Sequence, residues 1–316
     1  MKSIFKIIKL LFFCSALLVV VMLLFFGYRD IPIEDLTIKY GKAPSKFIEV
    51  DGMNVHYRDE GTSSDSLPVV LIHGTGSSLH TFNDWTTQLK LEHRVIRMDL
   101  PAYGLTGAFP DRNYSMKNYV LFLKRFLKAL GVPKCVLGGN SLGGGIAWNF
   151  AVDYPEMVDK LILIDASGYP TEAKSVPLAF QIAQIPIINT LFTFITPKFI
   201  ARKSVENVYA DKSKVSEALV DRYFQLTLRK GNRQAFIDKL IAHKEPSPYQ
   251  NITQLKQKTL VLWGDKDELI PVDAAHNFDR DLSNSTLVIL ENSGHVPMEE
   301  NPTESLAPVI SFLKSR

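Results

Sequence analysis

Hydrophobic positions along the chain follow two alternating patterns, short apolar runs and longer segments with helical spacing. The short runs are rich in β-branched residues, as in strands buried in a parallel sheet. They cover 68–72, 94–98, 135–137, 161–164, 259–263 and 286–290. Between them lie helical segments such as 114–130. Two further runs, 46–50 and 53–57, flank Asp51-Gly52 and predict a β-hairpin. Strands that alternate with helices predict an α/β fold with a mostly parallel, doubly wound sheet.

The alternation stops after Asp165, because about 90 residues pass before the next strand signal at Thr259. This interval has only helical patterns and begins with the very apolar stretch 176–200. Pro186 and Pro197 divide that stretch into pieces too short to cross a membrane. We therefore expect a helical cap at 169–250, inserted after the sixth strand, between two parts of the core at 46–168 and 251–316.

A separate apolar segment lies at the N-terminus. Residues 10–26 contain no charged side chain, and with Gly27 and Tyr28 they span about 28 Å as a helix. A bilayer core is about 30 Å thick. Lys2, Lys6 and Lys9 precede the segment, and the positive-inside rule places them in the cytoplasm.

This segment predicts a single-pass membrane anchor at 1–29, a linker at 30–45, and an extracytoplasmic body, periplasmic or extracellular. A cleaved signal peptide is the alternative. The apolar run is longer than such peptides usually carry, however, and its exit at Phe26-Gly27-Tyr28-Arg29 lacks an A-x-A-like cleavage site.

Charge and composition exclude several classes of function. Of the 316 residues, 46% are hydrophobic and 22% charged, as in ordinary globular proteins. The first 30 residues hold the whole net charge of +3, so the body is neutral and no nucleic-acid partner is expected. Cys14 and Cys135 form neither a disulfide framework nor a zinc cluster. No obligate protein partner is evident.

A candidate nucleophile lies in Gly139-Asn140-Ser141-Leu142-Gly143, a G-x-S-x-G pattern. An apolar run precedes it and a helix-like segment follows. Such a strand, sharp turn and helix would hold the Ser141 hydroxyl at the apex of a strained turn, where flanking glycines avoid a clash. A glycine-rich turn without a nucleophile is the alternative interpretation.

A serine nucleophile needs a base and an acid that orients it. His295 follows the last strand signal and starts a loop, so it is the candidate base. For the acid we favour Asp267 over Asp265, which lies directly at the turn after the strand 259–263, and over Asp165 at the end of the sixth strand. The remaining histidines are expected at surface or packing positions; they are His56, His80, His93, His243 and His276.

An oxyanion formed at Ser141 needs two N–H donors. The loop His73-Gly74-Thr75-Gly76-Ser77-Ser78 follows a strand and should bring the Thr75 N–H near the serine, with Gly74 beside it. The second donor would be the N–H of Leu142. We expect His73 to brace this loop rather than to act as a base.

These motifs resemble those of the α/β-hydrolase superfamily, over essentially Lys46 to Arg316. They are HGTGSS, DLPAYGLTG, GNSLGG, WGDKDELIP and SGHVPMEENP, and the order Ser141, Asp267, His295 is the order of that superfamily. The chain looks most similar to membrane-anchored bacterial lipases and monoacylglycerol-lipase-like hydrolases. The resemblance implies a serine hydrolase of lipophilic esters, acting without metal or cofactor. One departure is Ala102, where many relatives have glycine.

Two other functions remain open. A carbon–carbon bond hydrolase of aromatic catabolism uses a similar turn, but typically has an aromatic residue where Val296 follows His295. A non-catalytic binding protein would be expected to lack a triad member. The apolar stretch 176–200, with Phe192 and Phe194, predicts acyl chains of about C8 or longer, because each buried methylene contributes about 0.8 kcal/mol.

Overall fold

The computed structural model describes residues 2–62, 67–242 and 247–315. Within these residues one eight-stranded sheet has the order β1-β2-β4-β3-β5-β6-β7-β8. The expected hairpin is confirmed, since β1 (Ser45–Val50) pairs antiparallel with β2 (Met53–Glu60). The other strands run parallel to one another; they are β3 (Val69–Ile72), β4 (Val95–Met98), β5 (Cys135–Asn140), β6 (Val158–Ile164), β7 (Lys258–Gly264) and β8 (Ser285–Leu290).

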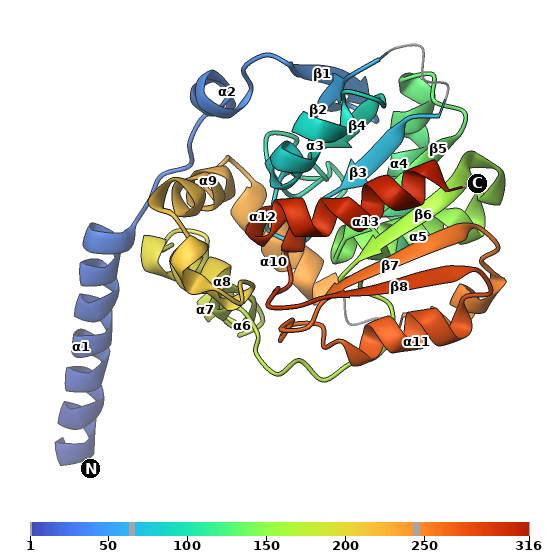
Figure 1. Ribbon diagram of the computed structural model, residues 1–316. Helices are drawn as coiled ribbons and strands as arrows, with labels where there is room; N and C mark the ends of the chain where they lie inside the picture. The colour runs from blue at the N-terminus through green and yellow to red at the C-terminus, as the bar shows by residue number, and fades with distance from the viewer. Residues whose placement is uncertain (1, 63–66, 243–246, 316) are drawn as a thin grey trace.

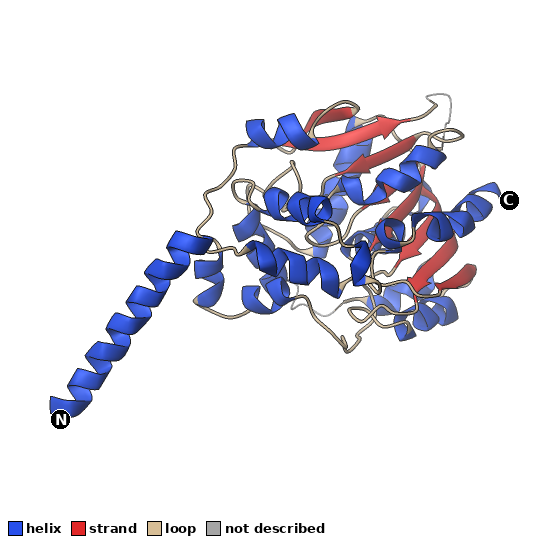
Figure 2. Ribbon diagram, turned by 60° about the vertical axis from the view of Figure 1, so that its left-hand side comes forward, coloured by secondary structure: helices blue, strands red, loops and turns tan. Residues whose placement is uncertain are grey.

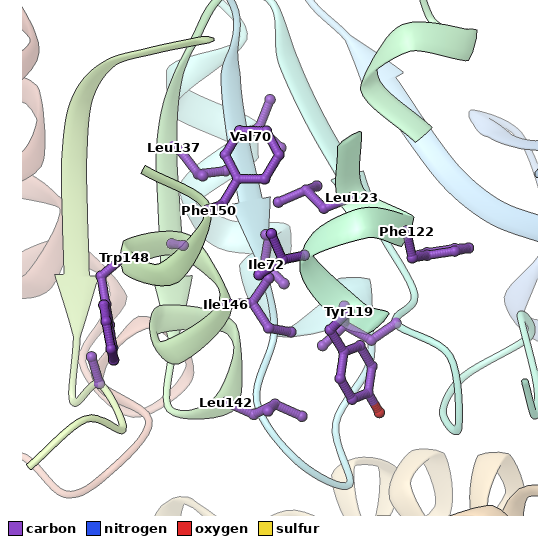
Figure 3. Close-up of a cluster of buried hydrophobic side chains, with 14 of the residues drawn as sticks. Val70, Ile72, Tyr119, Phe122, Leu123, Leu137, Leu142, Ile146, Trp148 and Phe150 are labelled. Carbon is purple, nitrogen blue, oxygen red and sulfur yellow. The ribbon is translucent and has the colours of Figure 1, made fainter. Parts of the chain in front are cut away.

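Helices cover both faces of the sheet (Figure 1). On one face lie α4 (Met116–Ala129), α5 (Leu142–Asp153) and α11 (Asp273–Asp281), and on the other α3 (Asn83–Leu89) and α13 (Pro302–Lys314). Figure 3 shows how α4 and α5 bury their apolar faces against β3 and β5. The predicted doubly wound fold is therefore confirmed, and it places the C-terminal ends of the parallel strands along one edge.

The interruption after β6 is a helical cap. It consists of α6 (Leu178–Ala183), α7 (Ile188–Phe192), α8 (Lys198–Asn207), α9 (Glu217–Thr227) and α10 (Asn232–Ala242). The apolar stretch 176–200 forms two short helices and the start of a third. Part of the predicted cap, 243–246, lies outside the described residues.

The N-terminal helix α1 (Lys2–Phe26) extends away from the body (Figures 1 and 2). Its stretch Ile4–Phe26 is long and apolar enough to cross a membrane, and none of it is buried against the protein. After α1 the chain passes beside the cap and forms α2 (Ile33–Tyr40) before β1.

Candidate active site

Ser141 lies in a strained turn between β5 and α5. Its backbone has φ 54° and ψ −117°, a region that residues other than glycine rarely adopt. A Cβ on Gly143 would lie 2.2 Å from the Ile72 carbonyl oxygen, and one on Gly139 would lie 2.3 Å from the Gly143 backbone. Both glycines are thus needed for α5 to start directly against β3 and β5, which is the physical reason for the pattern around Ser141.

The structure brings His295 and Asp267 together from two loops. Asp267 follows β7, and His295 lies between β8 and α12 (Pro297–Glu300). Asp267 Oδ2 lies 2.6 Å from His295 Nδ1, and Asp267 Oδ1 accepts the N–H groups of Leu269 and Ile270. The Asp267 carboxylate therefore fixes Nδ1–H as the donor and leaves Nε2 of His295 free to accept a proton.

The two competing aspartates take other positions. Asp265 is partly exposed; it pairs with Lys266 at 2.9 Å and accepts a hydrogen bond from the Ser293 N–H. These contacts stabilise the turn after β7. Asp165 is fully buried and accepts the Gly264 N–H at 3.0 Å. Its Oδ2 has no hydrogen-bond partner among the described residues. Burial, and then the charge of Asp267, raise the pKa of Asp165 well above its usual range.

Asp165, Asp267 and His295 also bring possible metal-ligand atoms within 4.8 Å of one another. Metal ligands must be deprotonated and have an available lone pair. The raised pKa of Asp165 disfavours its ionised form, and Asp267 already accepts three hydrogen bonds. The donor set therefore fits a hydrogen-bonded triad better than a divalent cation.

The candidate oxyanion donors lie on both sides of Ser141. A Cβ on Gly74 would lie 3.0 Å from the Ser141 Cβ, so the loop after β3 approaches the serine closely. Thr75 borders the same pocket as Ser141. Leu142 is the first residue of α5, where N–H groups have no partner inside the helix and the helix dipole favours negative charge.

His73 is buried and braces the loop after β3. Its Nε2 accepts the Leu100 N–H at 2.9 Å, so Nδ1 carries the proton and donates to the Gly74 carbonyl at 2.8 Å. Burial lowers the pKa of His73, which keeps the ring neutral. This geometry matches the expected bracing role and holds the backbone beside Thr75.

A second serine–histidine–aspartate arrangement lies outside the pocket. Ser45 Oγ is 2.8 Å from His56 Nε2, and His56 Nδ1 is 2.7 Å from Asp99 Oδ2. Ser45 also accepts a hydrogen bond from Arg58. The arrangement ties the β1–β2 hairpin to the loop after β4, so His56 packs as expected. His243 lies outside the described residues.

The pocket above Ser141 is a cavity of about 110 Å³ between the strand ends and the cap. Its wall is mostly apolar. The residues include Gly74, Thr75, Tyr103, Ser141, Phe180, Phe192, Thr196, Ile200, Phe224, Leu226, Phe236 and His295. Among the described residues that line it, none is Lys, Arg, Asp or Glu. Ala102, the departure from the family pattern, also borders it and has φ 87°, which glycine adopts more easily.

Three groups that the sequence did not indicate position the His295 loop. Asn140 Nδ2 donates to the His295 carbonyl at 2.9 Å, and the His295 N–H donates to the carbonyl of Val208 in the cap. Glu300 is buried and accepts the N–H groups of Gly294 and Asp211. Asn140 and Glu300 lie inside recognisable motifs, but their partners are backbone groups that no sequence spacing indicates.

Comparison with known proteins identifies the family. The sequence model of the family described as α/β hydrolase fold matches residues 68–302. The chain belongs to this family. The resemblance inferred from the motifs is thus confirmed, and named hydrolases among the relatives support a hydrolase activity.

Individual relatives point to different substrates. An uncharacterized hydrolase, YugF of Bacillus subtilis, is 28% identical over 281 residues, covering 86% of this chain and 98% of YugF. A 2-hydroxy-6-oxononadienedioate/2-hydroxy-6-oxononatrienedioate hydrolase of Burkholderia vietnamiensis is 28% identical, covering 89% and 99%. The crystal structure of a membrane phospholipase A, a bacterial virulence factor, superposes with a TM-score of 0.72 at 25% identity, covering 99% of this chain and 98% of the other.

Proposed function

We propose that the protein is a serine hydrolase of lipophilic carboxylic esters such as acylglycerols. Ser141 attacks the ester carbonyl while His295 Nε2 takes its proton, and Asp267 orients the imidazole. The N–H groups of Thr75 and Leu142, beside Gly74, hold the oxyanion. The proton on His295 then passes to the leaving alcohol, and water releases the acyl group.

One observation carries this proposal: Ser141, in its strained turn, and His295, which is paired with the buried Asp267, border one apolar pocket. An apolar wall suits an acyl chain, because the chain loses no hydrogen bonds when it leaves water. The phospholipase named above, whose likeness extends over the N-terminal helix, supports a lipid ester as substrate.

Carbon–carbon bond hydrolysis is the second candidate, favoured by the relative from Burkholderia vietnamiensis. That relative's named substrates are dioate anions. A buried carboxylate needs a cation or several hydrogen bonds, and no Lys or Arg is found among the described residues that line this pocket. The pocket therefore fits a neutral ester better than a dienoate.

We further propose that α1 is retained as a membrane anchor, with its N-terminus in the cytoplasm and the hydrolase domain outside. The lysines before the apolar segment support this orientation. Contacts between the chain at Phe26–Ile31 and the cap support retention, because cleavage near residue 27 would remove part of this contact. A lipid hydrolase held at a membrane stays close to its substrate.

The test compares wild type with Ser141→Ala. Wild type should hydrolyse p-nitrophenyl esters and a monoacylglycerol and react with a fluorophosphonate probe. Ser141→Ala should lose both activities, with turnover reduced on the order of 10⁶-fold, while its circular dichroism is unchanged. Hydrolysis within tenfold of wild type would exclude the serine mechanism, and a higher kcat/KM on a 2-hydroxy-6-oxodienoate than on any ester would favour the second candidate.

A further inference from the structure

The end of α1 is joined to the cap by backbone hydrogen bonds. The Thr196 N–H donates to the Phe26 carbonyl at 3.0 Å, and the Tyr28 N–H donates to the Phe194 carbonyl at 3.2 Å. Gly27 and Ile195 form an antiparallel bridge between them. Figures 1 and 2 both show the C-terminal end of α1 beside the cap helices. The depth of this end in a bilayer therefore sets the depth of the adjoining cap.

The spacing of charges fixes that depth. Lys9 is the last charged residue before the apolar segment and Arg29 the first after it. The residues between them span about 28 Å as a helix, while a bilayer's hydrocarbon core is about 30 Å thick. The whole stretch up to Tyr28 is thus needed to cross the core. In a spanning α1, Phe194 and Ile195, which pair with Tyr28 and Gly27, would lie at the edge of the hydrocarbon.

The cap exposes apolar side chains at this same place. Six residues with large apolar side chains, each between 39% and 79% exposed, form what we call the cap apolar patch: Ile185, Ile187, Ile188, Leu191, Phe194 and Phe199. They are six of the ten exposed large hydrophobic residues outside α1 in the described part of the chain. The Phe199 ring contacts that of Phe26, with centroids 6.2 Å apart. Six exposed large apolar side chains within residues 185–199 are unfavourable in water.

The opposite side of the same elements borders the active site. Phe192, Thr196 and Ile200 line the pocket above Ser141, while Leu191, Phe194 and Phe199 face outward. The cavity of about 110 Å³ lies directly behind Phe192, Thr196 and Ile200. The segment 191–200 is the wall between the pocket and the patch.

We propose that the cap apolar patch lies among the acyl chains at the bilayer surface and that lipid esters enter the pocket past α7 and α8 directly from the membrane. The proposal rests on the anchor and the ester hydrolase activity proposed above. The occupant of the patch is lipid hydrocarbon, because the patch continues the apolar surface of α1 at the depth where the hydrocarbon ends. Burial of such a face about 5–10 Å deep is typical of interfacial helices.

A fluorescence measurement tests the location without using activity. The native Trp85, Trp148 and Trp263 are fully buried, so a new surface tryptophan is easily distinguished. Full-length Phe194→Trp is placed in phosphatidylcholine vesicles with or without bromine on the acyl chains. We expect roughly twofold quenching of its added emission by brominated lipid, as for a side chain at interfacial depth. Leu91→Trp is the matched control, because Leu91 is 69% exposed and precedes β4, at the N-terminal ends of the parallel strands and therefore opposite to the cap.

An activity measurement tests lipid entry. Ile187→Asp combined with Phe194→Asp changes two exposed residues that do not line the pocket. Hydrolysis of 1-oleoylglycerol carried in phosphatidylcholine vesicles should fall by roughly tenfold, because charge disfavours the acyl region. Hydrolysis of dissolved p-nitrophenyl acetate should stay within about twofold, because the patch only contacts lipid. Leu91→Asp should change neither rate.

Contrary outcomes are distinguishable from one another. Equal quenching of the two tryptophan variants, or an unchanged rate on vesicles, would overturn the proposal. A shift from dimer to monomer in Phe194→Asp, without quenching of Phe194→Trp, would assign the patch to a second copy and also overturn it. If wild type hydrolysed neither ester while Phe194→Trp was quenched, the proposed activity would fail and the membrane location of the patch would stand.

Discussion

At the residue scale, the orientation of His295 depends on the one carboxylate that faces its Nδ1. Asp267→Asn would present an amide N–H to that nitrogen and favour the wrong tautomer, with Nε2 protonated. We expect turnover of a p-nitrophenyl ester to fall roughly 10⁴-fold. Asp265→Asn, at the turn beside Lys266, is the matched control and should cost far less. A larger loss in Asp265→Asn or in Asp165→Asn would move the acid role to that residue.

The raised pKa of Asp165 should instead be detectable in how the free energy of unfolding depends on pH. Burial and the charge of Asp267 raise its pKa, so the folded protein keeps a proton that the unfolded chain loses above about pH 4. Between that pH and the raised pKa, increasing pH therefore lowers the free energy of unfolding of wild type. Asp165→Asn has no such proton, so its free energy of unfolding should rise relative to that of wild type between pH 4 and pH 7. Each pH unit by which the pKa of Asp165 is raised within this range corresponds to about 1.4 kcal/mol.

Denaturant unfolding at the two pH values measures this difference. Asp265→Asn provides the control, because, although burial opposes it, hydrogen bonds from Lys266 and Ser293 lower the pKa of Asp265. The stability linked to this carboxylate is lost only below about pH 4, so the substitution should change the free energy of unfolding by nearly the same amount at both pH values. Parallel stability curves for wild type and Asp165→Asn would contradict a neutral Asp165 in the folded state.

The site residues whose roles are set by local motifs could be predicted from the sequence. Ser141 and its glycines could be predicted because the clash that requires glycine comes from the turn itself. His295 and Asp267 follow strands whose C-terminal ends meet at one edge, so their meeting could be expected. The pairing of His56 with Asp99 and of Asn140 with the His295 carbonyl could not, because each joins segments far apart in sequence.

At the element scale, the proposed acyl-chain selectivity depends on the cap, and the structure separates two phenylalanines that the sequence placed together. Phe192 in α7 is buried and lines the pocket, but Phe194 is 60% exposed and faces outward. The reason is that α7 ends at Phe192 and the chain then turns to pair with Gly27 and Tyr28. Periodicity over 176–200 could not show this, because Pro186 and Pro197 break the stretch into short pieces of different orientation.

Phe192 therefore provides the test of chain-length selectivity. Phe192→Ala removes apolar wall from the pocket and should lower kcat/KM on a dissolved C8 ester about tenfold relative to acetate, equivalent to about 1.4 kcal/mol of lost contact. Phe194→Ala, the matched control, should leave the ratio unchanged on dissolved esters. The measurement is kcat/KM across p-nitrophenyl esters of increasing length. Equal effects of the two substitutions would show that the wall is not formed by Phe192.

At the scale of the whole molecule, the apolar helix α1 and the hydrolase domain share an interface that sequence patterns did not indicate. The apolar length of α1, its flanking charges and the strands of the core could all be predicted from the local sequence. The contact between residues 26–31 and the cap was not, since its partners lie at 194–196, 228 and 233. Backbone hydrogen bonds carry most of it, and they leave no side-chain signature.

Two truncations measure how much the contact between residues 26–31 and the cap contributes to stability. Removing residues 1–25 keeps Asp30, whose carboxylate lies 2.7 Å from the guanidinium of Arg233, a side chain only 6% exposed. Removing residues 1–31 also deletes Asp30 and the N–H of Ile31, which donates to the Leu228 carbonyl. A buried guanidinium left without its partner typically costs about 1–3 kcal/mol, so the shorter protein should melt several degrees lower. Asp30→Asn in the longer truncated form should lose part of the same stability, because it removes the charge but keeps the backbone. The same Tm for both truncations would mean that the cap is stable without residues 26–31.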